Sequence, residues 1–223
     1  MDLSTKYMGL ELKNPIIVGS SGMTSSVESV KRAEAAGAAA VVLKSIFEEE
    51  VALEYADFMK TARQFPKESQ YFDYDGRKIP IEYYDYIVRE ENLKKYATLV
   101  AESKKAVSIP VIASINCFLQ SVEWISYAQQ LEAAGADALE LNMFFPPTDF
   151  KKTRVDRKSI YFKATEAVTQ KLSIPTALKI SYCFSDPGPM IQKLSQTGIA
   201  GLVLFNRYFS PDIDIDNFTI TNG

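Results

Sequence analysis

The sequence predicts an α/β fold with one parallel sheet, and two observations lead to this prediction. First, one pattern occurs three times: a helical stretch ends at a glycine, an apolar strand follows, and the strand ends at an amide or ammonium side chain. The three copies are residues 31–44 (KRAEAAGAAAVVLK), 135–142 (GADALELN) and 192–206 (QKLSQTGIAGLVLFN). Second, six apolar strands alternate with helical stretches, which favours a parallel sheet. We therefore predict a (β/α)8, TIM-barrel-type fold that is incomplete, with about six βα units present.

The predicted strands are short apolar runs, each bounded by turn or helix-end signals. In chain order they cover residues 16–18, 39–43, 111–115, 138–141, 176–180 and 201–205. Two of them follow the same tripeptide, Ser-Ile-Pro, at residues 108–110 and 173–175. The longest helices between them are predicted over residues 89–105 and 159–171. Helix starts are predicted where Ser25 and Glu28 have capping-box spacing, at Ser121, and where Asp186 precedes a first-turn proline.

The whole chain, residues 1–223, is predicted to form a single barrel domain. Residues 48–86 break the βα rhythm with an acidic and then strongly aromatic stretch, which we interpret as an insertion after the second strand. The regular pattern stops after about residue 209, so the closing units of the barrel are expected to be missing. Because barrel enzymes bind phosphate at the loops after strands seven and eight, the chain alone is expected to bind a phosphorylated cofactor poorly.

Composition excludes several kinds of function. The chain contains no histidine, which rules out Ser-His-Asp and Cys-His catalysis and a histidine-bound metal. The net charge is −3 without a basic block, which disfavours nucleic acid binding. No apolar run approaches the roughly 20 residues that span a bilayer, and the start lacks a signal-peptide pattern. Cys117 and Cys183 have no metal-site spacing. We expect a cytoplasmic protein that acts on a small molecule.

Polar side chains at the carboxyl ends of the predicted strands are the candidate functional residues. In parallel α/β folds these ends meet at one side of the sheet, where ligands bind. A Gly-Ser-Ser-Gly loop at residues 19–22 allows close approach of its backbone to a flat ligand. The other candidates are Lys44, Ser45, Asn116, Asn142, Lys179 and Asn206.

Taken in order, these residues resemble the class 1 dihydroorotate dehydrogenases. The resemblance rests on Asn14-Pro15 before the Ser-Gly loop, Lys44-Ser45, Glu140-Leu141-Asn142, Lys179 and Asn206. It implies a barrel that holds FMN at the strand ends and oxidises dihydroorotate to orotate in pyrimidine biosynthesis. By position, it assigns flavin contacts to Ser20, Ser21, Lys44, Ser45, Asn142 and Lys179 and substrate contacts to Asn142 and Asn206, with Lys44 as the catalytic cation. A homodimer is the expected assembly, and the sequence leaves the oligomeric state open.

The chain departs from this family where the substrate binds. Phe145 stands at the position of the family's catalytic base, and Pro147 stands at that of a substrate-binding asparagine. Arg207 replaces a small hydroxyl residue. The chain therefore resembles the family at the flavin-binding positions and not at the substrate-binding positions. We expect poor oxidation of dihydroorotate and a different natural substrate. Cys117 and Cys183 are the remaining candidate bases.

Two other functions fit the sequence. One is a flavin- or metabolite-binding barrel without turnover. The other is a barrel aldolase in which Lys179, inside an apolar strand, forms a Schiff base, since burial lowers the pKa of a lysine and activates it as a nucleophile.

Overall fold

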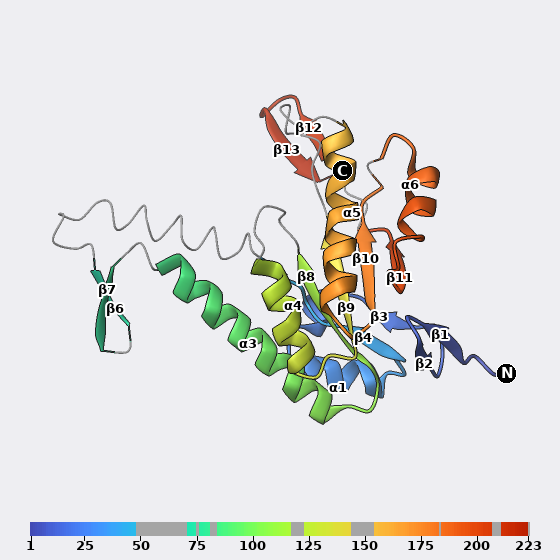
Figure 1. The fold of residues 1–223 in the computed structure, drawn as a ribbon, viewed down its shortest axis with the longest axis horizontal. Coiled ribbons are helices and arrows are strands. Elements are labelled where there is room, and N and C mark those ends of the chain that lie inside the picture. Colours follow the sequence, from blue (N-terminus) through green and yellow to red (C-terminus); the bar gives the residue numbers. More distant parts are fainter. Residues whose placement is uncertain are drawn as a thin grey trace.

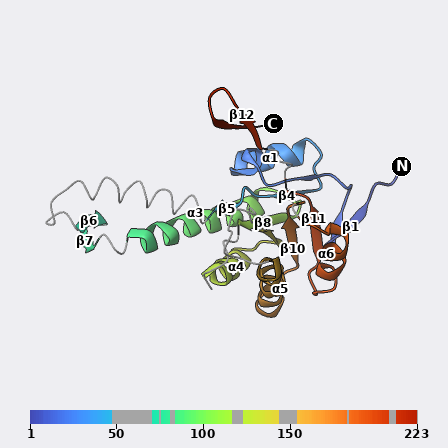
Figure 2. The ribbon, with the colours of Figure 1, turned by 90° about the horizontal axis from the view of Figure 1, so that it is seen from above.

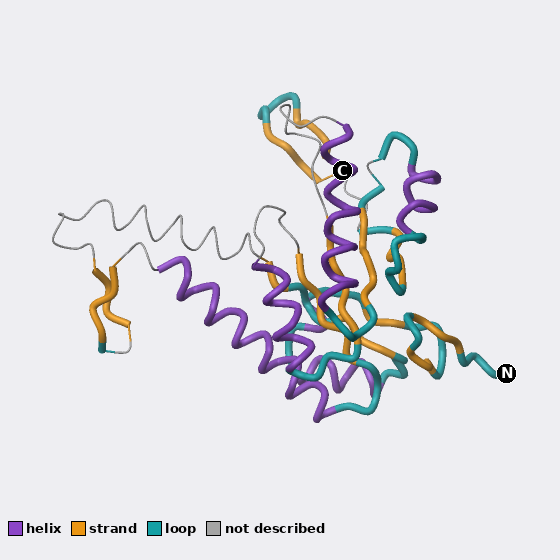
Figure 3. Tube along the Cα trace, viewed as in Figure 1, coloured by secondary structure: helices purple, strands orange, loops and turns teal. Residues whose placement is uncertain are grey.

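The computed structural model describes residues 1–47, 71–74, 76–80, 84–116, 123–143, 154–182, 184–206 and 211–222. Its centre is a sheet in which six parallel strands lie side by side in the order β11-β10-β9-β8-β4-β3 (Figures 1 and 3). In chain order these are β3 (Ile17–Val18), β4 (Ala40–Val42), β8 (Val111–Asn116), β9 (Ala138–Met143), β10 (Thr176–Ile180) and β11 (Gly201–Leu204). The predicted parallel arrangement of all six strands is confirmed.

Helices connect these strands and lie around them (Figure 2). They are α1 (Val27–Ala35), α3 (Tyr84–Ala106), α4 (Glu123–Ala133), α5 (Arg154–Lys171) and α6 (Pro187–Leu194), with a short 3-10 helix η1 (Gly22–Thr24) before α1. The two long helices begin five residues earlier than the sequence predicts, α3 at Tyr84 and α5 at Arg154. Six strands that curl inside helices form the larger part of a TIM barrel, so the predicted incomplete barrel is confirmed.

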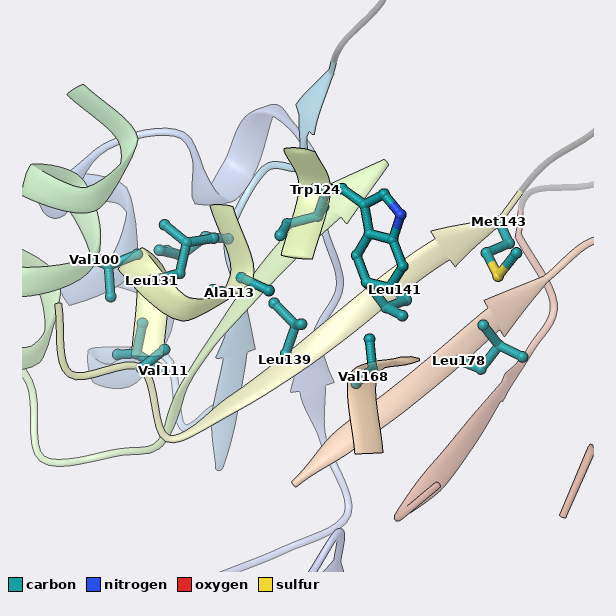
Figure 4. Close-up of a cluster of buried hydrophobic side chains, with 14 of the residues drawn as sticks. Val100, Val111, Ala113, Trp124, Leu131, Leu139, Leu141, Met143, Val168 and Leu178 are labelled. Atoms are coloured by element: carbon teal, nitrogen blue, oxygen red, sulfur yellow. The ribbon is translucent and has the colours of Figure 1, made fainter. Parts of the chain in front are cut away.

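The outer face of the sheet carries the main hydrophobic core. Alternate strand residues such as Val111, Leu139, Leu141 and Leu178 point outward and pack against the helices (Figure 4). From the helices come Val100 of α3, Trp124 and Leu131 of α4 and Val168 of α5 (Figure 4). Most of these side chains are fully buried. Burying one such aliphatic side chain contributes about 1.5–3 kcal/mol to stability, so this layer holds the helices in their places.

The inner face of the sheet is covered at the amino-terminal ends of the strands by a hairpin that the sequence reading missed. Strands β1 (Thr5–Tyr7) and β2 (Leu10–Leu12) pair antiparallel across a turn at Met8-Gly9. Met8 and Leu12 are buried in a second core with Ala40, Ile112 and Ala177 of the sheet. Strands of three residues give too short an alternation to be recognised from the sequence. The hairpin plugs this end of the barrel.

Three further short pairings lie outside the six-strand series. Strand β5 (Ile46–Phe47) pairs in parallel with the end of β8. Strands β6 (Tyr71–Tyr74) and β7 (Arg77–Pro80) form a hairpin that lies away from the sheet, beyond the start of α3 (Figure 1). Strands β12 (Pro211–Asp214) and β13 (Thr219–Asn222) form another antiparallel hairpin. Both hairpins fall in segments where the sequence breaks the βα rhythm. The boundaries of the predicted single domain and its insertion stay predictions.

Local signals placed most helix ends correctly. Gly37, Gly135 and Gly198 adopt positive φ angles of 99°, 95° and 83°, and each follows the end of a helix, as the repeated pattern predicts. The predicted cap at Ser25 is wrong by one residue: Ser26 caps α1, because its hydroxyl accepts from the amide of Ser29. Asp186 does precede α6, but its side chain makes no capping hydrogen bond. Ser121 lies outside the described residues.

The two Ser-Ile-Pro turns are held by glutamates from neighbouring helices. Oε1 of Glu34 accepts hydrogen bonds from the amide of Ser108 at 2.8 Å and from its hydroxyl at 2.6 Å. In the second copy, Glu132 accepts from the hydroxyl of Ser173 and from its amide at 2.8 Å. The hydrogen bonds from these serines are the main reason why the pKa values of both glutamates are lowered. The repeated tripeptide therefore marks a repeated αβ joint.

We expect Glu34→Gln and Glu132→Gln to lower the urea midpoint of unfolding at pH 7. Because folding lowers the pKa of both glutamates, their contribution is present above the ordinary value of 4.5 and is lost as pH falls through the folded value. The deficit of each variant should therefore shrink below about pH 4. Glu102→Gln, at an exposed position of α3, serves as the control. If the urea midpoint of a variant lies below that of the wild type by the same amount at pH 3 and at pH 7, this account is contradicted.

Candidate functional site

The inner face of the sheet changes character along the strands. Near their amino-terminal ends it carries small and aliphatic side chains, such as Ala138 and Ala177, beneath the β1–β2 hairpin. Two residues further along the same face stand Glu140 and Lys179. Two residues beyond Glu140 stands Asn142, which is buried. A period of two places these polar groups on the inner face, while their neighbours Leu139, Leu141 and Leu178 join the outer core.

Glu140 and Lys179 form a buried ion pair across β9 and β10. Oε1 of Glu140 lies 3.4 Å from Nζ of Lys179, and the side chains are 5% and 13% exposed. Burial raises the pKa of Glu140, while the charge and hydrogen bond of Lys179 and the hydroxyl of Ser114 act in the opposite direction. The net effect is a raised pKa of Glu140, and strongly perturbed carboxyl groups beside a cavity are common at functional sites.

Three serine hydroxyls continue this network toward the strand ends. Ser114 Oγ donates to Glu140 Oε1 at 3.3 Å. Ser114 Oγ also lies 2.7 Å from Ser45 Oγ, which in turn lies 3.0 Å from Ser20 Oγ. The backbone amide of Ser45 donates to Ser20 Oγ at 2.9 Å. The four side chains come from the ends of β3 and β4 and from β8 and β9, so the network crosses four neighbouring strands.

A local irregularity of the sheet turns Ser45 inward. Val42 pairs with Ile112 and Ile46 pairs with Ile115, so three residues, 43–45, stand opposite two residues, 113–114. Such an extra residue bends a strand and redirects its side chains. At the gap, the hydroxyl of Tyr96 from α3 accepts from the amide of Ser114 at 2.9 Å and donates to its carbonyl at 3.1 Å. Tyr96 thus satisfies the backbone groups that the interruption leaves unpaired.

A cavity of about 290 Å³ lies against the inner face. Its walls are largely apolar, and Glu140 and Lys179 are its charged lining residues. The remaining lining residues come from the hairpin, from Gly19 and from the inner or edge positions of the strands: Tyr7, Met8, Ile17, Val42, Ile112, Ala177, Leu202, Val203 and Leu204. Burial and the charge of Glu140 raise the pKa of Tyr7 to about 12, so this phenol stays neutral. Small-molecule sites have this character, a concave apolar wall with a few convergent polar groups.

The predicted site residues divide into three groups. Asn142 and Asn206 are brought together, because the amide of Asn206 donates to Oδ1 of Asn142 at 3.1 Å. Ser20, Ser45 and Lys179 belong to the connected inner network described above.

The third group contains the predicted residues that stand apart from this network. Lys44 is exposed after β4. Ser21 is also exposed, and its hydroxyl accepts from the amide of Met23 at 3.2 Å to cap η1. Asn116 pairs in register with Asn142 at the ends of β8 and β9. The predicted positions Cys117, Phe145, Pro147, Cys183 and Arg207 lie outside the described residues.

Sequence reasoning missed Glu140, Ser114 and Tyr7 as site residues. Glu140 lies inside an apolar run, two residues before Asn142, and this period-two spacing was the signal that could have identified it. Ser114 stands in the same way two residues before Asn116, so the same spacing could have identified it. Within the described residues, no group of three or more His, Cys, Asp or Glu side chains could hold a metal ion. None of the described helices is long and apolar enough to cross a membrane.

Comparison with solved structures supports the barrel. The "IMP dehydrogenase/GMP reductase-like protein" of Corynebacterium glutamicum superposes over 94% of this chain and 50% of its own, with a TM-score of 0.51 and 11% identity. A phosphonopyruvate hydrolase superposes over 91% of this chain and 62% of its own, with a TM-score of 0.51 and 15% identity. The chain has a TIM-barrel-type fold. At these identities, the likeness concerns the fold alone.

Comparison of sequences gives a more specific but partial likeness. No family model matches the chain. A protein of Aeropyrum pernix described as "Putative dihydroorotate dehydrogenase A (fumarate)" is 31% identical over 124 residues. The match covers 55% of this chain and 40% of that relative, so the chain spans less than half of the protein that it resembles.

Proposed function

We propose that this chain belongs to an FMN-dependent oxidoreductase of the dihydroorotate dehydrogenase type, which oxidises a small planar substrate at the carboxyl ends of the barrel strands. The observation that carries the proposal is the buried Glu140–Lys179 pair on the wall of an apolar cavity, close to the Asn142–Asn206 amides. The likeness of half the chain to the Aeropyrum pernix protein supports the same class of enzyme.

The residues of the site fit the ring system of a flavin. Its pyrimidine edge alternates hydrogen-bond donors and acceptors, and the amides of Asn142 and Asn206 offer both kinds of group. Its flat apolar faces suit Gly19, Val42 and Val203 on the cavity wall. Lys179 provides a cation for the edge of the ring, and Lys44 lies exposed after the neighbouring β4. When bound, a flavin supplies hydride acceptance, and nearby positive charge favours its reduced form.

The chain's own residues would orient the substrate and handle its proton. Asparagine side chains at the strand ends can bind a ring amide through a donor and an acceptor together. Oxidation of a carbon–carbon single bond also releases a proton, and Glu140 is the buried carboxyl group nearest to the cavity wall. Because Phe145 occupies the family's base position, we infer that the natural substrate differs from dihydroorotate.

Flavin binding tests the proposal. We expect the purified chain to bind riboflavin, and to bind FMN no more tightly than riboflavin. We expect Lys179→Met or Asn142→Leu to weaken riboflavin binding by about tenfold, the loss of one good polar contact. Riboflavin lacks the phosphate, so it isolates the contacts made to the ring. Lys171→Met, at the exposed end of α5, is the control. Flavin fluorescence quenching gives the affinities. Equal riboflavin affinities of Lys179→Met, Asn142→Leu and the control Lys171→Met would contradict the proposal. Failure of the protein to bind either flavin would also contradict it.

Anaerobic mixing with dihydroorotate separates turnover from binding alone. We expect slow bleaching of the flavin absorbance with dihydroorotate, because the family's base is replaced by Phe145. A positioned base contributes about 10²–10⁴-fold to such a step. Rapid bleaching would show that dihydroorotate is the substrate, while absence of bleaching by every related cyclic amide would favour a binding protein without turnover.

The position of Lys179 also supports a second candidate, a Schiff-base aldolase. Its ammonium group faces a cavity and has a carboxyl group 3.4 Å away that could transfer protons. However, a carboxylate partner stabilises the charged form of lysine, whereas a Schiff-base lysine must be neutral to attack. Borohydride trapping with pyruvate, read by mass spectrometry, distinguishes the two. An adduct on Lys179 would favour the aldolase, and we expect none.

A further inference from the structure

The serine network has a direction, which follows from its donors and acceptors. Ser20 Oγ already accepts a hydrogen bond from the amide of Ser45, so its own proton is available to Ser45 Oγ. Ser45 can then donate to Ser114 across 2.7 Å, and Ser114 donates to Glu140. Every hydroxyl in the series therefore accepts from one neighbour and donates to the next. The series ends at the one group in it that can keep a proton, the Glu140 carboxylate.

The network also connects an accessible end to a buried end. Ser20 is half-buried after the end of β3, where the strand ends open toward a ligand. Ser45 and Ser114 are buried, and Ser114 is fully so. Glu140 lies deeper, on the wall of the cavity. The three O···O spacings of the series are 3.0, 2.7 and 3.3 Å, so each hydroxyl is hydrogen-bonded to the next group and a proton can pass along the series by successive shifts of hydrogen bonds.

We propose that Glu140 is the proton store of this site, and that Ser114, Ser45 and Ser20 form a relay that exchanges its proton with a ligand bound at the strand ends. The ligand is a substrate that loses a proton as it is oxidised. Its X–H bond breaks, X keeps the electron pair, and an O–H bond forms at Ser20. The proton of Ser20 passes to Ser45, that of Ser45 to Ser114, and that of Ser114 to Oε1 of Glu140. The flavin of the proposed function, when bound, would accept the hydride that the substrate loses.

The surroundings of Glu140 are suited to reversible proton storage. Among the described residues, the titratable groups whose charges interact with it are Lys179 from β10, Tyr7 from β1 and Tyr96 from α3. Both tyrosines have raised pKa values and stay neutral, so Lys179 is the one charge within the described part of the chain that acts on the carboxyl group. Lys179 favours the carboxylate and burial favours the acid, and this opposition allows Glu140 to take up and release a proton.

A pH jump on the purified chain without added flavin tests this relay. The carbonyl stretch of the protonated Glu140 carboxyl group, identified by its absence in Glu140→Gln, is followed by time-resolved infrared spectroscopy. We expect a titration midpoint above the ordinary 4.5 of glutamate. We expect Ser45→Ala and Ser114→Ala to slow protonation of Glu140 about tenfold or more, the effect of removing a positioned proton carrier.

Two variants control for a purely structural role of the serines. Ser103→Ala makes the same change at a fully buried serine whose hydroxyl has no hydrogen-bond partner among the described residues, and should leave the protonation rate unchanged. Ser45→Thr keeps the hydroxyl and should restore the rate to within about twofold of wild type. If Ser45→Ala destabilises the fold, Ser20→Ala at the half-buried end interrupts the same relay.

The relay rests on the proposed function, because the oxidised substrate supplies its proton. The experiment can nevertheless refute the relay and the proposed function separately. A protonation rate in Ser45→Ala and Ser20→Ala equal to that of Ser103→Ala would overturn the relay, and so would a titration without a band that depends on Glu140. Failure of flavin binding would overturn the proposed function but leave these infrared measurements intact.

Discussion

Lys179→Met should destabilise the protein strongly, and more at pH 8 than at pH 5. The substitution keeps the volume of the side chain but removes the cation that lies 3.4 Å from Glu140. Breaking a buried ion pair by removing one partner costs about 3–5 kcal/mol, because the other charge stays buried. We expect a loss of about 3 kcal/mol at pH 8, since the cavity gives Glu140 some access to water. Urea denaturation at both pH values measures it.

The pH dependence follows from the pKa of Glu140. Burial raises this pKa in the folded protein, and Lys179 opposes the rise, so its removal raises the pKa further. A carboxyl group with a raised folded pKa stabilises the protein below its unfolded pKa, and this contribution is lost as pH rises through the folded value. In the variant, Glu140 therefore takes up a proton as pH falls toward 5, and the penalty of an unpaired charge decreases.

A double variant provides the control. Glu140→Leu with Lys179→Met removes both charges, and replacing a buried pair by apolar residues of similar volume is often neutral. We expect the double variant to recover most of the lost stability at pH 8, so that the two substitutions are strongly non-additive. An equal loss in single and double variants, or a loss in Lys179→Met that does not change with pH, would show that the ion pair is not its cause.

Much of the fold could be predicted because its signals are local. Gly37, Gly135 and Gly198 mark the same joint three times, and apolar runs of three to six residues follow each of them. Strand order then follows from the alternation of strands and helices. The β1–β2 hairpin could not be predicted in the same way. Its burial comes from contacts with strands more than a hundred residues away, such as Met8 with Ala177, and its own sequence is ordinary.

Part of the candidate site could also be predicted, because some of its residues follow directly from the topology of the strands. Strand-end side chains such as Asn142 and Asn206 stand at positions that the topology brings together, and their amides do meet. The Ser45–Ser114 contact depends instead on an extra residue between β4 and β5, which redirects Ser45 inward. The strand propensities of Leu43, Lys44 and Ser45 do not predict this irregularity, because it arises from their pairing with β8. The serine network was therefore visible only in three dimensions.

Gly201→Val should displace the β1–β2 hairpin from the sheet. A Cβ atom built at Gly201 would lie 3.0 Å from Cε2 of Tyr7 and 3.1 Å from Cγ of Met8. These approaches are tighter than most Cβ contacts in proteins, so Tyr7 and Met8 would have to shift by a few tenths of an ångström within their packed surroundings. Added methyl groups in a packed core typically cost about 1–3 kcal/mol. We expect a loss of about 2 kcal/mol and increased binding of a hydrophobic dye, since Met8 and Leu12 would become exposed.

Two variants isolate the contact with the hairpin. Gly22→Val adds the same side chain at an exposed glycine with nothing within 4 Å of the added Cβ, and should leave stability and dye binding almost unchanged. Tyr7→Ala combined with Gly201→Val makes room beside the new side chain, so the pair should cost less than the sum of the single substitutions. Additive costs would mean that Tyr7 and Gly201 do not meet and that the hairpin does not close this end of the barrel. The cavity would then lose Tyr7 and Met8 from its wall, and a small ligand would be bound by the strands alone.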